Sequence, residues 1–115
     1  MGTVVSDFSQ EMTMPTQSTA SASSGLPKFH LGRTVMTRGV QAHVVSGRLD
    51  PTPFLRRHHR GDWGDLCDSD KRANDQGVRS GGRLMSSYKV NESLTLWIIT
   101  EWGRSVTTLL LPSEY

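Results

Sequence analysis

Three β-prone segments near the C-terminus constrain the fold of this chain more than any other feature. Residues 83–90, 94–101 and 105–111 are rich in β-branched, aromatic and leucine residues, and only three residues separate each segment from the next. Such short connections are typical of β-hairpins, so the pattern predicts a three-stranded antiparallel meander. In the middle segment both alternating sets of side chains are largely apolar, so we expect both faces of the sheet to be at least partly covered.

A short strand and a first helix are predicted upstream of the meander. Residues 33–37 are β-prone and are followed by a turn-like pair, residues 38–39. The apolar residues of 40–45 follow helical spacing, and Gly47 stands where a helix commonly ends. We expect the strand to pair along an edge of the meander.

Capping residues indicate two further helices. Asp50 is well placed as an N-cap, with prolines in the first turn behind it, and this helix is expected to end before Gly61. Residues 68–75 predict a short, mostly exposed helix that begins with Asp68 as its N-cap and ends at Gly77.

These elements predict one α+β domain over residues 27–115, in which a short strand, two to three short helices and the three-stranded antiparallel β-meander follow one another. Residues 1–26 differ in composition: they contain no Lys or Arg, and residues 13–25 are rich in Ser and Thr. Such a segment buries too little apolar surface to offset the loss of chain entropy, so we expect a disordered tail.

Charge and cysteine content limit the class of protein. The tail holds two acids, which leaves 13 basic and 9 acidic residues, a net charge of +4, to the domain. This balance permits binding to nucleic acid or to an acidic protein. Cys67 is the one cysteine, which excludes an internal disulfide, and the chain contains neither a secretory signal nor an apolar run of about 18 residues. We therefore expect a soluble, cytoplasmic protein that does not enter a membrane.

The densest polar cluster, residues 57–65, contains the strongest candidates for catalysis. His58 and His59 beside Asp62 suggest a general base or a metal site. Adjacent histidines at a helix end point in different directions, however, and no zinc-binding spacing is present. We expect His58 to cap the helix C-terminus and to pack on Trp63, and His59 to be solvated.

Neither a metal nor a cofactor is expected. The acids of this region do not follow the spacing of a calcium-binding EF-hand loop, and turn and helix-cap chemistry explains them more simply. Cys67 would be a nucleophile only if a histidine lay beside it, and a half-buried structural role is favoured. The acids in question are Asp62, Asp65, Asp68 and Asp70.

Tryptophans and arginines indicate where a partner is bound. Trp63 lies between two glycines in a turn and is expected to pack at the joint between helices and sheet, whereas Trp97 belongs to the core. Trp102 lies at a hairpin tip and is expected to be exposed as an interface anchor, with packing back onto the sheet as the alternative. Arginine suits contacts with phosphate or carboxylate, although ordinary ion pairs on a solvated face are the alternative. The predicted binding residues are Arg56, Arg57, Arg60, Arg83, Trp102 and Arg104.

Six motifs follow one another between residues 29 and 115. They read LGRxVxTxGV from Leu31, RHxxGDWG from Arg57, DKRxN from Asp70, RLxSxY from Arg83, LWIITE from Leu96 and RSxTTxLLPxEY from Arg104. Their content and order resemble a family of small, mostly uncharacterised proteins encoded on bacterial plasmids and integrative elements. Members carry descriptions such as plasmid-related protein or type I restriction endonuclease subunit M. The long tail and Trp102 depart from the usual pattern of the family.

The resemblance implies an accessory protein of a mobile genetic element. A restriction methyltransferase needs a Rossmann-like domain for its methyl donor and an Asn-Pro-Pro-aromatic motif, and this chain is too short for the first and lacks the second. We therefore expect a non-enzymatic protein that binds a host-defence or plasmid-maintenance protein, or nucleic acid. The alternative is a small hydrolase or nuclease that uses His58, Arg60 and Asp62. A sheet with two apolar faces also leaves a homodimer open.

Overall fold

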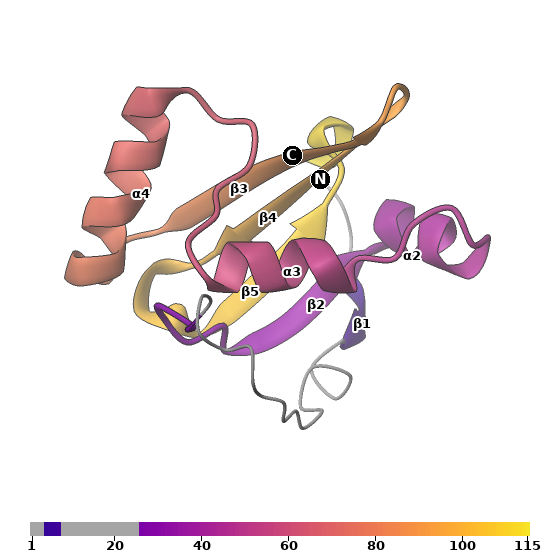
Figure 1. Ribbon diagram of the computed structural model, residues 1–115. Helices are drawn as coiled ribbons and strands as arrows, with labels where there is room; N and C mark the ends of the chain where they lie inside the picture. Colours follow the sequence, from indigo (N-terminus) through magenta and orange to yellow (C-terminus); the bar gives the residue numbers. More distant parts are fainter. Residues whose placement is uncertain (1–3, 8–25) are drawn as a thin grey trace.

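The computed structural model describes residues 4–7 and 26–115, and in these ranges the protein is an α+β fold, as predicted. Three helices pack against a mixed sheet whose strand order is β1-β2-β5-β4-β3 (Figure 1). The elements are β1 (Val4–Asp7), β2 (Arg33–Thr37), α2 (Arg38–Val45), α3 (Thr52–His59), α4 (Asp68–Ser80), β3 (Leu84–Asn91), β4 (Leu94–Thr100), η2 (Trp102–Arg104), β5 (Val106–Leu110) and η3 (Pro112–Glu114). None of the described helices has the length and apolarity needed to cross a membrane.

The predicted meander is confirmed, since β3 pairs with β4 and β4 with β5, both antiparallel. The predicted strand β2 joins the meander through β5, and the two run parallel. Strand β1 pairs antiparallel with β2, so the expectation of a disordered tail does not hold for Val4–Asp7. The rest of that expected tail, residues 1–3 and 8–25, lies outside the described residues.

Helix α2 begins two residues earlier than expected. The side chain of Thr37 accepts a hydrogen bond from the backbone N–H of Val40 and caps the helix, so the turn predicted at residues 38–39 is wrong and these residues form the first helical turn. The far end follows the prediction, because Gly47 adopts a φ of 80° just behind the helix. At the next helix the N-cap residue is Pro51 and not Asp50 as predicted, although Oδ1 of Asp50 accepts from the backbone N–H of Thr52.

Helix α4 is longer than predicted and passes through Gly77 to Ser80. A Cβ atom at Gly77 would lie 2.9 Å from Cδ2 of Leu84, so this glycine allows the helix to approach the start of β3 closely. The helix ends instead at Gly81, whose φ is 87°. Its N-cap residue is Cys67, not Asp68, which forms part of the first turn.

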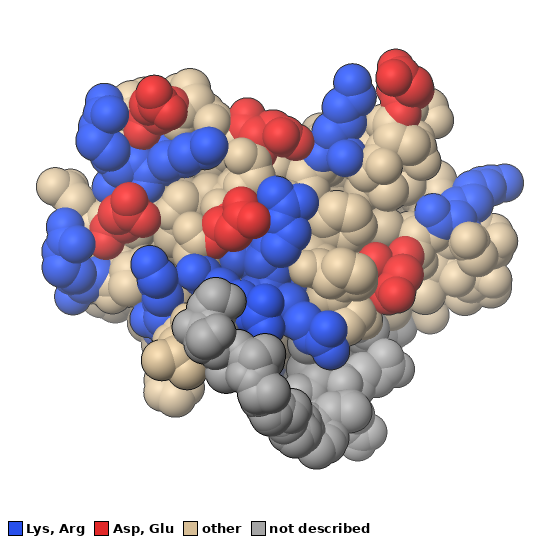
Figure 2. All heavy atoms as spheres, in the orientation of Figure 1, with Lys and Arg blue, Asp and Glu red and all other residues tan. Residues whose placement is uncertain are grey.

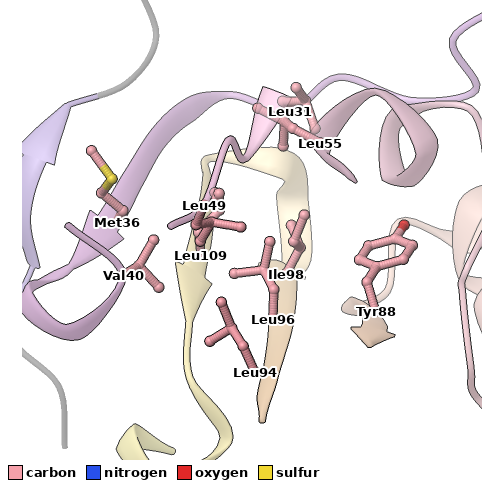
Figure 3. Packing of buried hydrophobic residues seen from close by; sticks show 10 residues of the cluster. All are labelled: Leu31, Met36, Val40, Leu49, Leu55, Tyr88, Leu94, Leu96, Ile98 and Leu109. Carbon is pink, nitrogen blue, oxygen red and sulfur yellow. The ribbon is translucent and has the colours of Figure 1, made fainter. Parts of the chain in front are cut away.

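The core lies between helices α2 and α3 and one face of the sheet (Figures 1 and 3). The predicted apolar face of β4 is buried, with Leu96 and Ile98 fully covered. Leu55 from α3 and Val40 from α2 pack against this face. Each of these short helices contributes few side chains to the core, but these two are fully buried. The central cluster comprises Leu31, Met36, Val40, Leu49, Leu55, Tyr88, Leu94, Leu96, Ile98 and Leu109.

The C-terminus contributes to the opposite face of the sheet. The ring of Tyr115 lies 5.5 Å from that of Trp97, which is half-buried and belongs to this second face instead of the central core.

The carboxylate of Glu114 accepts hydrogen bonds from the hydroxyl of Thr37 at 2.5 Å, from the N–H of Gly39 at 2.9 Å and from that of Leu111 at 2.8 Å. Burial opposes the ionisation of Glu114, but these hydrogen bonds outweigh it, so that its pKa lies below the ordinary value.

The outer edge of β3 is closed by side chains and by an irregular segment. The amide of Asn74, on α4, donates to the carbonyl of Met85 at 2.7 Å and accepts from the N–H of Met85 at 3.2 Å. Further along the strand, Ser87 accepts from the N–H of Asp65 at 2.7 Å and donates to the carbonyl of Trp63. The side chains and loop thus take the place of a neighbouring strand.

Candidate functional site

His58 lies at the end of α3 and is fully buried over the sheet. Its Nδ1 is 2.6 Å from Oγ of Ser86, and its Nε2 is 2.9 Å from Oγ1 of Thr100. A chain of hydrogen bonds continues through Thr107, whose hydroxyl is 2.7 Å from that of Thr100 and donates to the carbonyl of Leu31 at 2.6 Å.

The direction of this chain follows from its end. The carbonyl of Leu31 only accepts, so Thr107 must donate to it and is left to accept from Thr100. Thr100 in turn accepts from Nε2 of His58, and Nδ1 accepts from Ser86. Nε2 therefore carries a proton. Because burial disfavours a second proton on the ring, the imidazole is neutral and Nδ1 is the acceptor.

Burial is the main cause that lowers the pKa of His58 to about 3, and the nearby charges of His59 and Arg104 act in the same direction. The predicted contact with Trp63 is confirmed, with the ring centroids 5.6 Å apart. The expected capping of the helix C-terminus is wrong, because both ring nitrogens bond to strand hydroxyls instead of to helix carbonyls.

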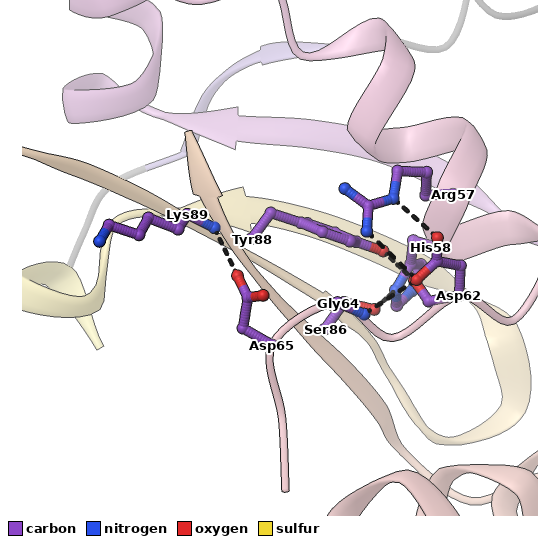
Figure 4. A network of polar contacts seen from close by, with 8 residues as sticks. All are labelled: Arg57, His58, Asp62, Gly64, Asp65, Ser86, Tyr88 and Lys89. Atoms are coloured by element: carbon purple, nitrogen blue, oxygen red, sulfur yellow. Dashed lines mark hydrogen bonds and ion pairs between the residues drawn. The ribbon is translucent and has the colours of Figure 1, made fainter. Parts of the chain in front are cut away.

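The side chain of Asp62 forms its hydrogen bonds with groups other than His58 (Figure 4). Its carboxylate pairs with Nε of Arg57 at 2.8 Å and accepts from the N–H of Gly64 at 3.2 Å. The hydrogen bond from Arg57 is the main cause that lowers the pKa of Asp62. Tyr88 donates to the backbone carbonyl of Asp62, and Arg57 lies over the Tyr88 ring, 4.7 Å from its centroid. Asp62 thus holds the turn against the sheet.

Trp63 packs at the joint between helices and sheet, as predicted, and only 3% of its surface is exposed. Its Nε1 donates to Oδ1 of Asp75 on α4 at 2.9 Å, and its ring stacks on Phe29 at 6.0 Å. The neighbouring Gly64 approaches β3 so closely that a Cβ atom there would lie 2.1 Å from the carbonyl oxygen of Ser87. The turn therefore requires glycine for both its φ of 78° and this contact.

Two predicted environments are wrong. His59 is half-buried instead of solvated, because its ring lies 5.8 Å from that of Phe29, and burial is the main cause that lowers its pKa. Cys67 is exposed instead of half-buried, since it begins α4 on the surface and its Sγ is 3.3 Å from Oγ of Ser69. In the described part of the chain the thiol is hydrogen-bonded to the hydroxyl of Ser69 and not to a histidine.

The acids of the region serve local structure. Asp65 accepts from the N–H of Lys89 at 2.8 Å, and Asp68 and Asp70 lie in the first turn of α4, where the helix dipole stabilises them. Across residues 4–7 and 26–115, no three His, Cys, Asp or Glu side chains are grouped so that they could hold a metal ion.

Three of the predicted binding arginines are engaged within the fold. The first is Arg57, which pairs with Asp62. The second is Arg104, which donates to the carbonyls of Gly82 and Gly77 at 2.5 and 2.6 Å. Its guanidinium also lies 5.5 Å from the centroid of Phe29, and burial lowers its pKa. Arg104 therefore ties the β4–β5 connection to the C-terminal end of α4.

Arg83 pairs with Glu101 at 3.5 Å and donates to the hydroxyl of Tyr115 at 3.1 Å. The antiparallel register of β3 and β4 brings Arg83 to the end of the sheet where Arg104 lies. Their side chains contact different aromatic rings, Tyr115 for Arg83 and Phe29 for Arg104.

Arg56 and Arg60 are the predicted arginines that remain outward. Arg56 lies on α3 and Arg60 is its C-cap residue, and both are exposed. Neither forms an ion pair with any residue of the described ranges. Figure 2 shows that basic side chains gather around α3, at the centre and lower part of the face in view. Lys28 joins them, because its backbone N–H donates to the carbonyl of His59 and its side chain runs beside Gly61.

We call Lys28, Arg56 and Arg60 the basic end of α3. Sequence reasoning missed Lys28, since it precedes the first predicted strand and reaches α3 only through a contact spanning about 30 residues of chain. No signal in the local sequence indicated it.

Trp102 is exposed over 75% of its surface, as predicted. It opens η2, the connection between β4 and β5, in which Gly103 donates to the carbonyl of Gly81 at 3.2 Å. With Arg104 anchored beside it, the connection is held on α4 while the indole remains in solvent. The guanidinium of Arg104 lies over the ring of Phe29, and Phe29 follows Lys28 in the chain. The β4–β5 connection therefore lies in the same region as the basic end of α3.

Comparison with protein-family models, curated proteins and solved structures finds no match to this chain.

Proposed function

We propose that this chain is a non-enzymatic accessory protein of a mobile genetic element that binds a macromolecular partner, nucleic acid, through the basic end of α3. The observation that carries the binding proposal is the pair Arg56 and Arg60, exposed and without an acidic partner among the described residues. The mobile-element part rests on the six sequence motifs between residues 29 and 115.

The arrangement of the basic end has an energetic cost without a partner. Arg56 and Arg60 are four residues apart, so their side chains are neighbours on one helix face, and like charges at this spacing destabilise a helix by about 0.2–0.5 kcal/mol. The negative end of the helix dipole offsets part of that repulsion. A bound polyanion would remove the remainder and release counterions.

The arginines of this surface bind phosphate by paired hydrogen bonds, which supports nucleic acid. The net charge of +4 on residues 27–115 acts in the same direction, since it attracts polyanions at long range. An acidic protein offers carboxylates for the same contact, and a comparison with polyglutamate distinguishes the two.

The alternative, a hydrolase or nuclease using His58, Arg60 and Asp62, has weaker support. His58 is fully buried and both of its ring nitrogens are hydrogen-bonded, so it has no free lone pair to take a proton from a substrate. Asp62 is paired with Arg57. The three side chains therefore do not form a working acid–base pair in this conformation.

Fluorescence anisotropy with labelled DNA and RNA across a salt series tests the proposal. We expect binding at low salt that weakens as salt rises, with a smaller salt slope for Arg56→Ala/Arg60→Ala. Arg38→Ala/Arg48→Ala is the matched control: it removes two exposed charges from the α2 side of the molecule and should bind like the unaltered protein. Absence of binding at low salt would overturn the proposal.

A further inference from the structure

The β4–β5 connection presents an aromatic ring to solvent in a way that the fold itself does not use. Trp102 is 75% exposed, and no ring or cation contact of its indole is present among the described residues. Trp63 and Trp97, by contrast, both have aromatic neighbours. Exposing so large an apolar ring forgoes the stabilisation that burial gives, and tryptophan is enriched among the residues that anchor binding partners.

The connection is also restrained. Gly103 is hydrogen-bonded to the carbonyl of Gly81, and Arg104 donates to Gly77 and Gly82. Arg104 holds a φ of 63°, which a non-glycine residue adopts only when its surroundings require it. The ring is thus attached to a fixed support, which reduces the entropy that a partner must remove on binding.

Restraint and charge together point to one kind of ligand. We infer that Trp102 stacks on an unpaired base while the basic end of α3 contacts phosphates, so that the protein prefers single-stranded to double-stranded nucleic acid. Base faces are free in a single strand and covered in a duplex, whereas both forms offer phosphates to Lys28, Arg56 and Arg60. This inference rests on the proposed function and adds the form of the partner.

An acidic protein is a less suitable occupant of the same surface. A protein interface anchored by tryptophan is commonly surrounded by further apolar side chains. The immediate neighbours of Trp102 in the chain are instead Glu101, Gly103 and Arg104, and Gly81 lies against the connection.

Anisotropy with one sequence of about 16 nucleotides, as single strand and as duplex, tests the inference. We expect the single strand to bind at least roughly tenfold more tightly than the duplex. Trp102→Ala should lose roughly tenfold in affinity for the single strand and leave duplex binding unchanged, whereas Trp102→Phe, which keeps a ring, should lose less. Arg38→Ala/Arg48→Ala again serves as the control, and circular dichroism checks that each variant is folded.

The outcomes separate the inference from the proposed function. If single strand and duplex bind equally and Trp102→Ala binds like the unaltered protein, the stacking inference is overturned while nucleic-acid binding by the basic end stands. If neither form binds at low salt, both are overturned. If polyglutamate of equal charge binds as tightly as the single strand, the surface recognises charge alone, and the inference again fails.

Discussion

His58 donates a 2.9 Å hydrogen bond through Nε2 to the hydroxyl of Thr100, in the fully buried space between α3 and β4. The bond joins a helix end to a strand 42 residues further along the chain. Because a carbonyl terminates the chain of hydroxyls behind Thr100, the relationship determines which nitrogen carries the proton. The ¹⁵N chemical shifts of the imidazole report that assignment directly.

The free energy of unfolding is expected to fall as the pH drops below 6.5. The pKa of His58 is about 3 in the folded protein and 6.5 in the unfolded chain, so between these values only the unfolded state binds the proton. For this group the free energy of unfolding decreases by up to about 1.4 kcal/mol per pH unit. Asp62 and Glu114, whose pKa values are lowered, add a loss at lower pH.

Urea unfolding at a series of pH values measures this slope. His59→Gln is the control, because the pKa of His59 is lowered as well and the variant leaves the contribution of His58. A flat profile between pH 6.5 and about 5 in that variant would contradict the neutral, buried imidazole.

Thr107→Val should lower the free energy of unfolding by about 1–3 kcal/mol. Valine keeps the shape but removes the hydroxyl that links Thr100 to the carbonyl of Leu31, and both groups are then left without this partner in a buried position. Thr108→Val, on the opposite face of the same strand, is the matched control and should change stability by less than about 0.5 kcal/mol. Chemical denaturation compares the two variants, and equal losses would argue against the hydrogen-bond chain.

Gly64→Ala should destabilise the protein far more than Gly47→Ala. Both glycines have a φ near 80°, so alanine incurs backbone strain of about 1–2 kcal/mol at either position. Only at Gly64 would the added Cβ also meet a backbone atom, 2.1 Å from the carbonyl of Ser87, while Gly47 has nothing within 4 Å. Thermal unfolding of both variants gives the difference, and similar melting temperatures would show that the turn does not rest so closely on β3.

Glu114→Ala is expected to cost about 1–2 kcal/mol, because Thr37 and Gly39 lose their acceptor at the start of α2 and Leu111 loses its acceptor at the start of η3. Ser113→Ala, an exposed neighbour, controls for changes in the C-terminal turn. Hydrogen exchange of the Gly39 and Leu111 amides measures the effect residue by residue. Unchanged protection in Glu114→Ala would contradict the capping role.

The meander and the position of Trp63 were predictable from the sequence, because both depend on local patterns: alternation with short turns, and a tryptophan between two glycines. The hydrogen-bond chain of His58 was not, since its partners lie 28 and 42 residues away. A signal was nevertheless present. Ser86 and Thr100 interrupt the apolar, inward-facing positions of β3 and β4, and a polar residue at such a position requires a buried partner.

The roles of the arginines could not be read from spacing for the same reason. Arg104 reaches carbonyls 22 and 27 residues away, and the partners of Arg83 become neighbours only through the strand register and the C-terminal turn. Gly77 misled the prediction of α4 because glycine serves both to end helices and to let them pack closely, and local sequence does not distinguish the two uses.

The closed edge of β3 restricts how this protein can associate with itself. A strand from another copy could join the sheet there only after Asn74 and the loop at Trp63 had released Met85 and Ser87. Growth of the sheet from molecule to molecule, the first step toward fibrils, is therefore opposed at this side by bonds that must break before any new ones form.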